Sequence, residues 1–220
     1  MPEYLIFNRM AITDNLKQFG IIPFDSATLI TALGNYKSPN DKIASINQED
    51  LLIRLKRGLF VVSPKILNQP LSQELIANHL YGPSYVSFQT ALSYYGLIPE
   101  RVHTIRSMTI KRSRNFTTPL GNFEYTGTTK DYYVIGITQE IVNDEYAFLI
   151  ATPEKTLCDM IIQTAGLRLQ SLKALQIYLV EDMRIDLSVI EHYDLEIIKQ
   201  CILVGKKKRE LTLLYNLLQK

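Results

Sequence analysis

Hydrophobic residues recur every three or four positions through the first 48 residues, the spacing of helices that bury one face. This period predicts helices over 4–19, 27–33 and 39–48. The third has the clearest start, because Ser38 is a suitable N-cap and Pro39 fits the first helical position. The opening segment of the chain is therefore expected to be helical.

Two short β-prone runs follow, at 51–55 and 59–63, joined by Lys56-Arg57-Gly58. Apolar runs separated by a short connection that ends in glycine indicate a β-hairpin. Three helices and a hairpin within about 65 residues are the order of a winged helix-turn-helix. In that fold the hairpin is the wing, and the 39–48 helix occupies the recognition position.

The rest of the chain changes from a β-rich to a helical pattern. After helices at 72–81 and 88–95, we expect strands at 104–110, 123–128, 132–137 and 146–150. The expected later helices are 153–164, 171–181, 187–192, 195–204 and 208–218. The fold class is therefore α+β: residues 1–66 form a winged helix-turn-helix DNA-binding domain, and residues 67–220 form a larger mixed α/β domain that ends in helices.

Composition restricts the class of protein. With 46% hydrophobic and 21% charged residues, the chain is globular. It has no run of eighteen apolar residues and no signal peptide pattern at its start, so we expect a cytoplasmic protein without a membrane partner. Cys158 and Cys201 lie in apolar helical patterns typical of buried free thiols. Metal-ligand spacings and glycine-rich phosphate motifs are missing, which favours a binding protein without metal, cofactor or catalytic residues.

Charge is unevenly distributed although the net charge is only +2. Residues 101–114 hold five bases and no acids, and residues 206–209 are four consecutive bases, whereas 140–196 contain eleven acids and four bases. Basic clusters are typical of nucleic-acid contact, and also of solvated helix ends and edge strands. The sequence leaves both interpretations of these two clusters open.

Candidate DNA-binding residues lie on the third helix and the hairpin. Cations near a duplex neutralise phosphates, and short polar side chains reach phosphates or base edges. The candidates are Lys37, Ser38, Asn40, Lys42, Ser45, Arg54, Lys56 and Arg57, and Asn47 is a further short polar residue on the same helix. The alternative is an ordinary edge hairpin in which Arg54 pairs with Asp50.

A second function class rests on Glu154, Lys155 and Asp159. Carboxylates and a lysine hold the metal and position water in metal-dependent nucleases. Here, however, Glu154 and Lys155 are adjacent at a helix start and would face different sides, and Glu154 suits the positive end of its helix. A third alternative is a protein-interaction scaffold that binds no DNA.

Three blocks together resemble the AbiEi-type antitoxins of bacterial abortive-infection (type IV toxin–antitoxin) systems. They are Asp41-Lys-Ile-Ala-Ser-Ile with Leu52-Ile-Arg-Leu-Lys-Arg-Gly-Leu-Phe-Val-Val, then Tyr85-Val-Ser with Ala91-Leu and Tyr95-Gly-Leu-Ile-Pro-Glu, then Ala151-Thr-Pro-Glu-Lys-Thr-Leu-Cys-Asp.

The resemblance implies a winged helix that binds operator DNA and represses its own operon. It also implies a C-terminal domain that counteracts a cognate nucleotidyltransferase-type toxin, with or without direct contact. By motif position, DNA reading falls on the helix of Lys42 and on Arg54, Lys56 and Arg57, while no antitoxin residue is assigned in the last 120 residues.

Overall fold

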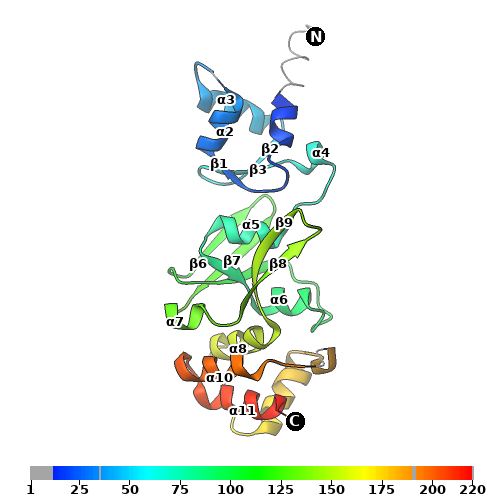
Figure 1. Cartoon of the computed structure of the whole chain (residues 1–220), viewed down its shortest axis with the longest axis vertical. Coiled ribbons are helices and arrows are strands. Elements are labelled where there is room, and N and C mark those ends of the chain that lie inside the picture. Colours follow the sequence, from blue (N-terminus) through cyan, green and yellow to red (C-terminus); the bar gives the residue numbers. More distant parts are fainter. Residues whose placement is uncertain (1–11, 35, 190–191, 220) are drawn as a thin grey trace.

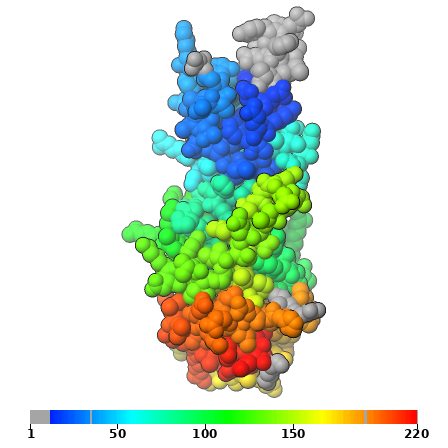
Figure 2. All heavy atoms as spheres, viewed as in Figure 1, coloured from blue at the N-terminus to red at the C-terminus, as the bar shows by residue number. Residues whose placement is uncertain are grey.

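Three tiers are stacked along the long axis of the computed structural model, which describes residues 12–34, 36–189 and 192–219 (Figure 1). The N-terminal elements form one end, a sheet with its helices forms the middle, and helices form the other end. The space-filling view shows the same order, with the blue and red parts of the chain at opposite poles (Figure 2).

The N-terminal tier combines helices with a small antiparallel sheet in the strand order β1-β3-β2. Its elements are a helical segment at 12–17, β1 (Phe24–Asp25), α2 (Ser26–Leu33), α3 (Pro39–Gln48), β2 (Leu52–Lys56) and β3 (Leu59–Val62). The expected helices at 27–33 and 39–48 and the hairpin are confirmed. The part of the helix expected at 4–19 that precedes position 12 lies outside the described residues.

Side chains of this tier explain why the elements form where they do. The Asp25 carboxylate caps α2 by accepting from the Thr28 amide at 2.8 Å. Leu16, Leu29 and Ile46 are fully buried in a common core with residues of the hairpin. Each helix thus turns one apolar stripe to the same small core.

The middle tier is a six-stranded mixed sheet in the order β6-β7-β5-β4-β9-β8. Its strands are β4 (Ser84–Val86), β5 (Thr104–Thr109), β6 (Arg114–Thr118), β7 (Gly121–Gly127), β8 (Ile137–Val142) and β9 (Tyr146–Ala151). The pairs β5–β7 and β4–β9 are parallel, and the other neighbours are antiparallel. The helices of this part are α4 (Pro64–Leu67), α5 (Gln73–Leu80), α6 (Phe88–Tyr94) and α7 (Lys130–Tyr133).

The strand expected at 132–137 is wrong. Residues Lys130–Tyr133 form the short helix α7, and β8 begins only at Ile137. Gly136 separates the two with a φ of 57°, and a Cβ there would lie 2.8 Å from side-chain atoms of both Ile197 and Lys155. The aromatic run that suggested a strand is thus a turn of helix that buries Tyr132.

The C-terminal tier is helical. It comprises α8 (Pro153–Gln163), α9 (Leu172–Ile177), the π-helical turn η1 (Tyr178–Asp182), the 3-10 turn η2 (Leu187–Val189), α10 (Leu195–Val204) and α11 (Lys208–Leu218). Where a helix is expected at 187–192, the described residues form only the three-residue 3-10 turn η2. The chain is thus a mixed α+β protein.

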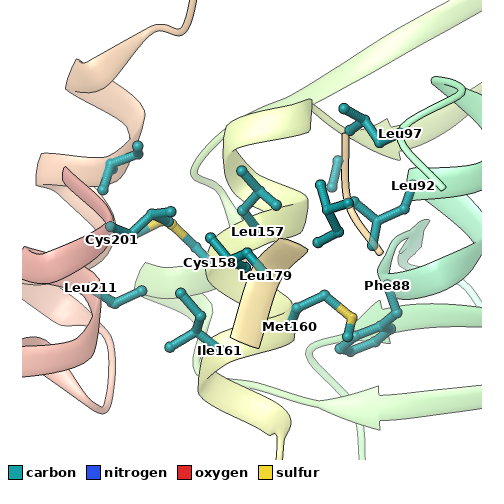
Figure 3. Close-up of a cluster of buried hydrophobic side chains, with 14 of the residues drawn as sticks. Phe88, Leu92, Leu97, Leu157, Cys158, Met160, Ile161, Leu179, Cys201 and Leu211 are labelled. Atoms are coloured by element: carbon teal, nitrogen blue, oxygen red, sulfur yellow. The ribbon is translucent and has the colours of Figure 1, made fainter. Parts of the chain in front are cut away.

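Helix α8 lies between the sheet side and the C-terminal helices (Figure 3). On one side Met160 lies near Phe88 of α6, and on the other Cys158 faces Cys201 of α10. Both cysteines are free and buried, as expected. Eight of the eleven residues of α8 are buried, so the helix is covered almost all round.

A charged pair lies inside this apolar packing. Lys155 and Asp159 are both fully buried, and their Nζ and Oδ1 atoms are 3.3 Å apart. The Lys155 Nζ also donates to the Tyr132 carbonyl at 2.9 Å. Asp159 accepts from the hydroxyls of Ser87 at 2.6 Å, Tyr132 at 2.8 Å and Tyr85 at 3.2 Å. We call these five residues the buried polar network.

We predict that breaking this network on one side is costly. Lys155→Met leaves the Asp159 charge buried without its cation and should lower the free energy of unfolding by about 3–5 kcal/mol. Asp159→Asn should be similarly harmful, while the double variant should cost less than the sum of the two. Urea denaturation measures all three.

The matched control is Lys199→Ala, because Lys199 pairs with Glu196 on the surface at 3.2 Å with both side chains at least half exposed. It should cost less than about 1 kcal/mol. A loss of that small size in Lys155→Met as well would contradict the structural role of the network.

Candidate nucleic-acid interface

A groove of about 450 Å³ lies between α3 and the β2–β3 hairpin. Its floor includes Ile43 and Phe60. Its polar lining consists of Ser26, Asn40, Asn47, Gln48, Arg54 and Arg57. Two guanidinium groups, three amides and a hydroxyl are thus gathered in one place, and no aspartate or glutamate is among the described residues that line the groove.

The groove side of α3 follows from helical geometry. Ile43 and Ile46 are buried, which sets the orientation of the helix on its core. At about 100° per residue, Asn40 and Asn47 lie on one flank of α3, next to the hairpin. Their amides carry donors and acceptors that suit base edges.

Lys42 and Ser45 lie on the other flank of α3 and do not line the groove. The Ser45 hydroxyl donates to the Glu49 carboxylate at 3.2 Å, and the Lys42 ammonium is 5.4 Å from the centre of the Tyr36 ring. Lys37 and Ser38 precede the helix and are exposed, and they too lie outside the groove lining.

The hairpin holds its turn through a glycine and a hydrogen bond to α2. Gly58 has a φ of 77°, which a tight turn requires there. Its carbonyl accepts from the Ser26 amide at 3.2 Å, so the turn is tied to the start of α2. A register shift between Arg54 and Lys56 interrupts the ladder of β2 with β3.

The hairpin presents its cations to different surroundings. Arg54 and Arg57 are exposed, and neither guanidinium has a hydrogen bond or ion pair with the described residues. Lys56 instead donates from Nζ to the Leu80 carbonyl at the end of α5. Burial lowers the pKa of Lys56, and the nearby charges of Lys111 and Arg114 lower that pKa further. Lys56 therefore belongs to the contact between the first two tiers.

The alternative pairing of Arg54 with Asp50 is wrong. The Asp50 carboxylate accepts from the Lys65 ammonium at 2.9 Å, and Lys65 lies on α4 behind the hairpin. Arg54 therefore remains available to a ligand of the groove.

Sequence reasoning missed Ser26 and Gln48 as members of the site. Gln48 lies one helical turn after Ala44 and two turns after Asn40 or Asp41, so helical periodicity indicates its flank. Ser26 reaches the groove only because β1 pairs with β3, and no local pattern indicates that contact.

The residues proposed for nuclease chemistry are enclosed. Glu154 is 6% exposed and accepts from the Asp194 amide at 2.9 Å, while Lys155 and Asp159 lie in the buried polar network. Within the described ranges, no group of three or more His, Cys, Asp or Glu side chains is arranged to hold a metal ion. These three residues therefore do not form a site open to a nucleic acid.

Comparisons with known proteins show a similarity of fold. No protein-family model matches the chain, and no curated protein matches it. The chain is similar in structure to the RV2827C protein from Mycobacterium tuberculosis, with a TM-score of 0.54 and 11% identity. The match covers 96% of this chain and 81% of that one. Among the described helices, none combines the length and apolar character that crossing a membrane requires.

We predict that replacing Lys56 and replacing Arg57 have different effects on the free energy of unfolding. Lys56→Met removes a hydrogen bond from a charged donor and should lower the free energy of unfolding by about 1–3 kcal/mol. Arg57→Ala, at an exposed position without a partner in the described structure, should change it by no more than about 0.5 kcal/mol. Thermal or urea unfolding of both variants measures the contrast, and equal effects would contradict the two assigned surroundings.

Proposed function

We propose that this chain is a DNA-binding regulator whose N-terminal tier is a winged helix-turn-helix. In this proposal α3 is the recognition helix and the β2–β3 hairpin is the wing. The proposal is supported by the element order, a helical segment, β1, α2, α3, β2 and β3, and by the pairing of β1 with β3.

The observation that carries the proposal is the composition of the α3 groove. Arg54 and Arg57 lie opposite the amides of Asn40, Asn47 and Gln48, and among the described residues neither arginine has a side-chain partner and no carboxylate lines the space between them. Guanidinium groups bind phosphates or guanine edges, and asparagine and glutamine amides suit adenine. A duplex lying along this groove would meet phosphate-binding and base-reading groups together.

We further propose that the protein is an antitoxin of the AbiEi type that represses its own operon and counteracts a nucleotidyltransferase-type toxin. The support is the ordered set of sequence blocks and where they lie. The first covers residues 41–46 of α3 and the hairpin, while the second and third contribute Tyr85, Ser87, Lys155 and Asp159 to the buried polar network. The residues that carry the resemblance thus include the two arginines of the groove, but not its amides, and the polar centre of the C-terminal half.

The DNA-binding proposal predicts tight, salt-sensitive binding to the DNA upstream of the gene. In fluorescence anisotropy the native sequence should bind more tightly than a scrambled duplex at two salt concentrations. Arg54→Ala with Arg57→Ala should weaken binding and reduce the salt slope by about two units, one for each lost phosphate contact.

The control removes two positive charges elsewhere. Arg168 and Lys173 are exposed, and their charged groups form no bond within the described structure. Arg168→Ala with Lys173→Ala should therefore leave the affinity and slope nearly unchanged. Equal losses in the two double variants would refute the groove as the DNA site.

The antitoxin proposal predicts that promoter repression can be lost while toxin neutralisation is retained. Co-expressed with the neighbouring toxin gene from an unrelated promoter, the Arg54→Ala/Arg57→Ala variant should rescue growth as well as the unaltered protein does, because its C-terminal half is unchanged. The same variant should derepress a reporter placed behind the native promoter. Failure of the unaltered protein to rescue growth would contradict the antitoxin proposal. It would not affect the DNA-binding proposal, which the anisotropy titration tests separately.

A further inference from the structure

A second hollow, of about 340 Å³, lies between the sheet and the C-terminal helices. The turn after β5, the start of α7, the end of α8 and the link between α10 and α11 contribute to its walls. We call it the basic cleft, defined by Ile110, Lys111, Arg112, Ile162, Val204 and Lys206. None of these residues belongs to the α3 groove.

The basic cleft brings together the two positive clusters that the sequence left unassigned. Lys111 and Arg112 come from the first cluster, and Lys206 comes from the second, about ninety positions later. The described residues that line the cleft include no aspartate or glutamate. Three like charges without a counter-charge create a local positive potential that attracts an anion.

The other three members of the second cluster each donate to a backbone carbonyl. Lys207 donates to the carbonyls of Ile161 and Thr164, and Lys208 donates to the Leu203 carbonyl at 2.9 Å. Arg209 donates to the Gln170 carbonyl at 3.3 Å. These contacts satisfy helix ends and loops, whereas Lys206 has no such bond within the described residues.

The two cations that the first cluster contributes to the cleft also differ in whether their side chains have a partner. The Lys111 ammonium donates to the Gly82 carbonyl and lies 5.2 Å from the centre of the Tyr81 ring, so it contributes charge from the side of the cleft. The Arg112 side chain is exposed and has no side-chain partner in the described structure. Of the cations that line the cleft in the described structure, Arg112 and Lys206 are therefore the two without a side-chain partner, and both can contact a ligand.

Apolar side chains stand beside these cations. Ile110 is 36% exposed and Val204 is 45% exposed, and both line the cleft with the half-buried Ile162. Covering large aliphatic side chains with an apolar surface removes them from water and is favourable. A ligand that matches the whole cleft therefore joins an anionic group to a group with an apolar face.

The geometry points to a nucleotide-binding cleft, in which Arg112 and Lys206 hold phosphate oxygens and the base lies against Ile110 and Val204. Guanidinium and ammonium groups are the side chains that proteins use for phosphate, and the volume lies in the range of small-ligand pockets. The nucleotide is either a free nucleoside phosphate or the phosphorylated end of a strand. The inference is independent of the proposed function of the α3 groove.

The first test is isothermal titration with ATP, pyrophosphate and adenosine. ATP should bind more tightly than either fragment, and Arg112→Ala with Lys206→Ala should weaken ATP binding at least about tenfold. Ile110→Ala with Val204→Ala should weaken ATP but leave pyrophosphate unchanged. The charge-matched control, Arg168→Ala with Lys173→Ala, should leave ATP binding unchanged.

The second test identifies the source of the nucleotide. A short single-stranded oligonucleotide, with or without a 5′-phosphate, is titrated into the Arg54→Ala/Arg57→Ala variant, so that the α3 groove contributes little. Preference for the 5′-phosphorylated strand over ATP assigns the cleft to strand ends, and the reverse preference assigns it to free nucleotides.

Two outcomes overturn the inference. One is the absence of binding of both ATP and the phosphorylated strand at millimolar concentration. The other is binding that the Arg112→Ala/Lys206→Ala variant retains, or that the control variant loses equally. The four cleft side chains replaced are at least one-third exposed, so unchanged melting temperatures are expected to show that each variant is folded.

Discussion

The buried ion pair of Lys155 and Asp159 is the constraint on which the arrangement of the last two tiers depends. Two charges removed from water need partners on every side, and here the partners come from β4, the cap of α6 and α7. Apolar packing alone tolerates many small displacements, whereas these hydrogen bonds are satisfied in one placement of α8. The burial of Tyr85 and Tyr132 raises the pKa of each, and the negative charge of Asp159 raises it further, so both tyrosines remain hydroxyl donors.

Further contacts attach α10 to α8 and the N-terminal tier to the sheet. Toward the C-terminus, Cys158 packs on Cys201 and Glu154 accepts from the Asp194 amide, which places α10 on α8. Toward the N-terminus, Ile21, Leu55 and Val61 pack into the same apolar cluster as α5 and β7. The hairpin thus has two roles: Leu55 and Lys56 attach the first tier to the sheet, while Arg54 and Arg57 line the groove without a side-chain partner in the described part of the chain.

Local signals predict the N-terminal tier well. Proline in the first turn of α3 and a glycine-ended connection between apolar runs each act over a few residues, so α3 and the hairpin are found nearly to the residue. The expected N-cap Ser38 precedes α3, but in the described structure its side chain forms no capping hydrogen bond. Features set by distant contacts escape such reasoning. The strand β4 is three buried residues without alternation, Tyr132 of α7 donates to Asp159 from 27 positions away, and Ser26 joins the groove through β1. The basic cleft likewise depends on residues about ninety positions apart.

The most direct test of the central claim, that a duplex lies between α3 and the hairpin, is photo-crosslinking followed by mass spectrometry. The upstream duplex carries a photoreactive thymine analogue at successive positions, and the crosslinked peptides are sequenced. The DNA-binding proposal predicts crosslinks within residues 39–48 and 53–58. Crosslinks confined to residues 101–219, with none on α3 or the hairpin, would contradict the account.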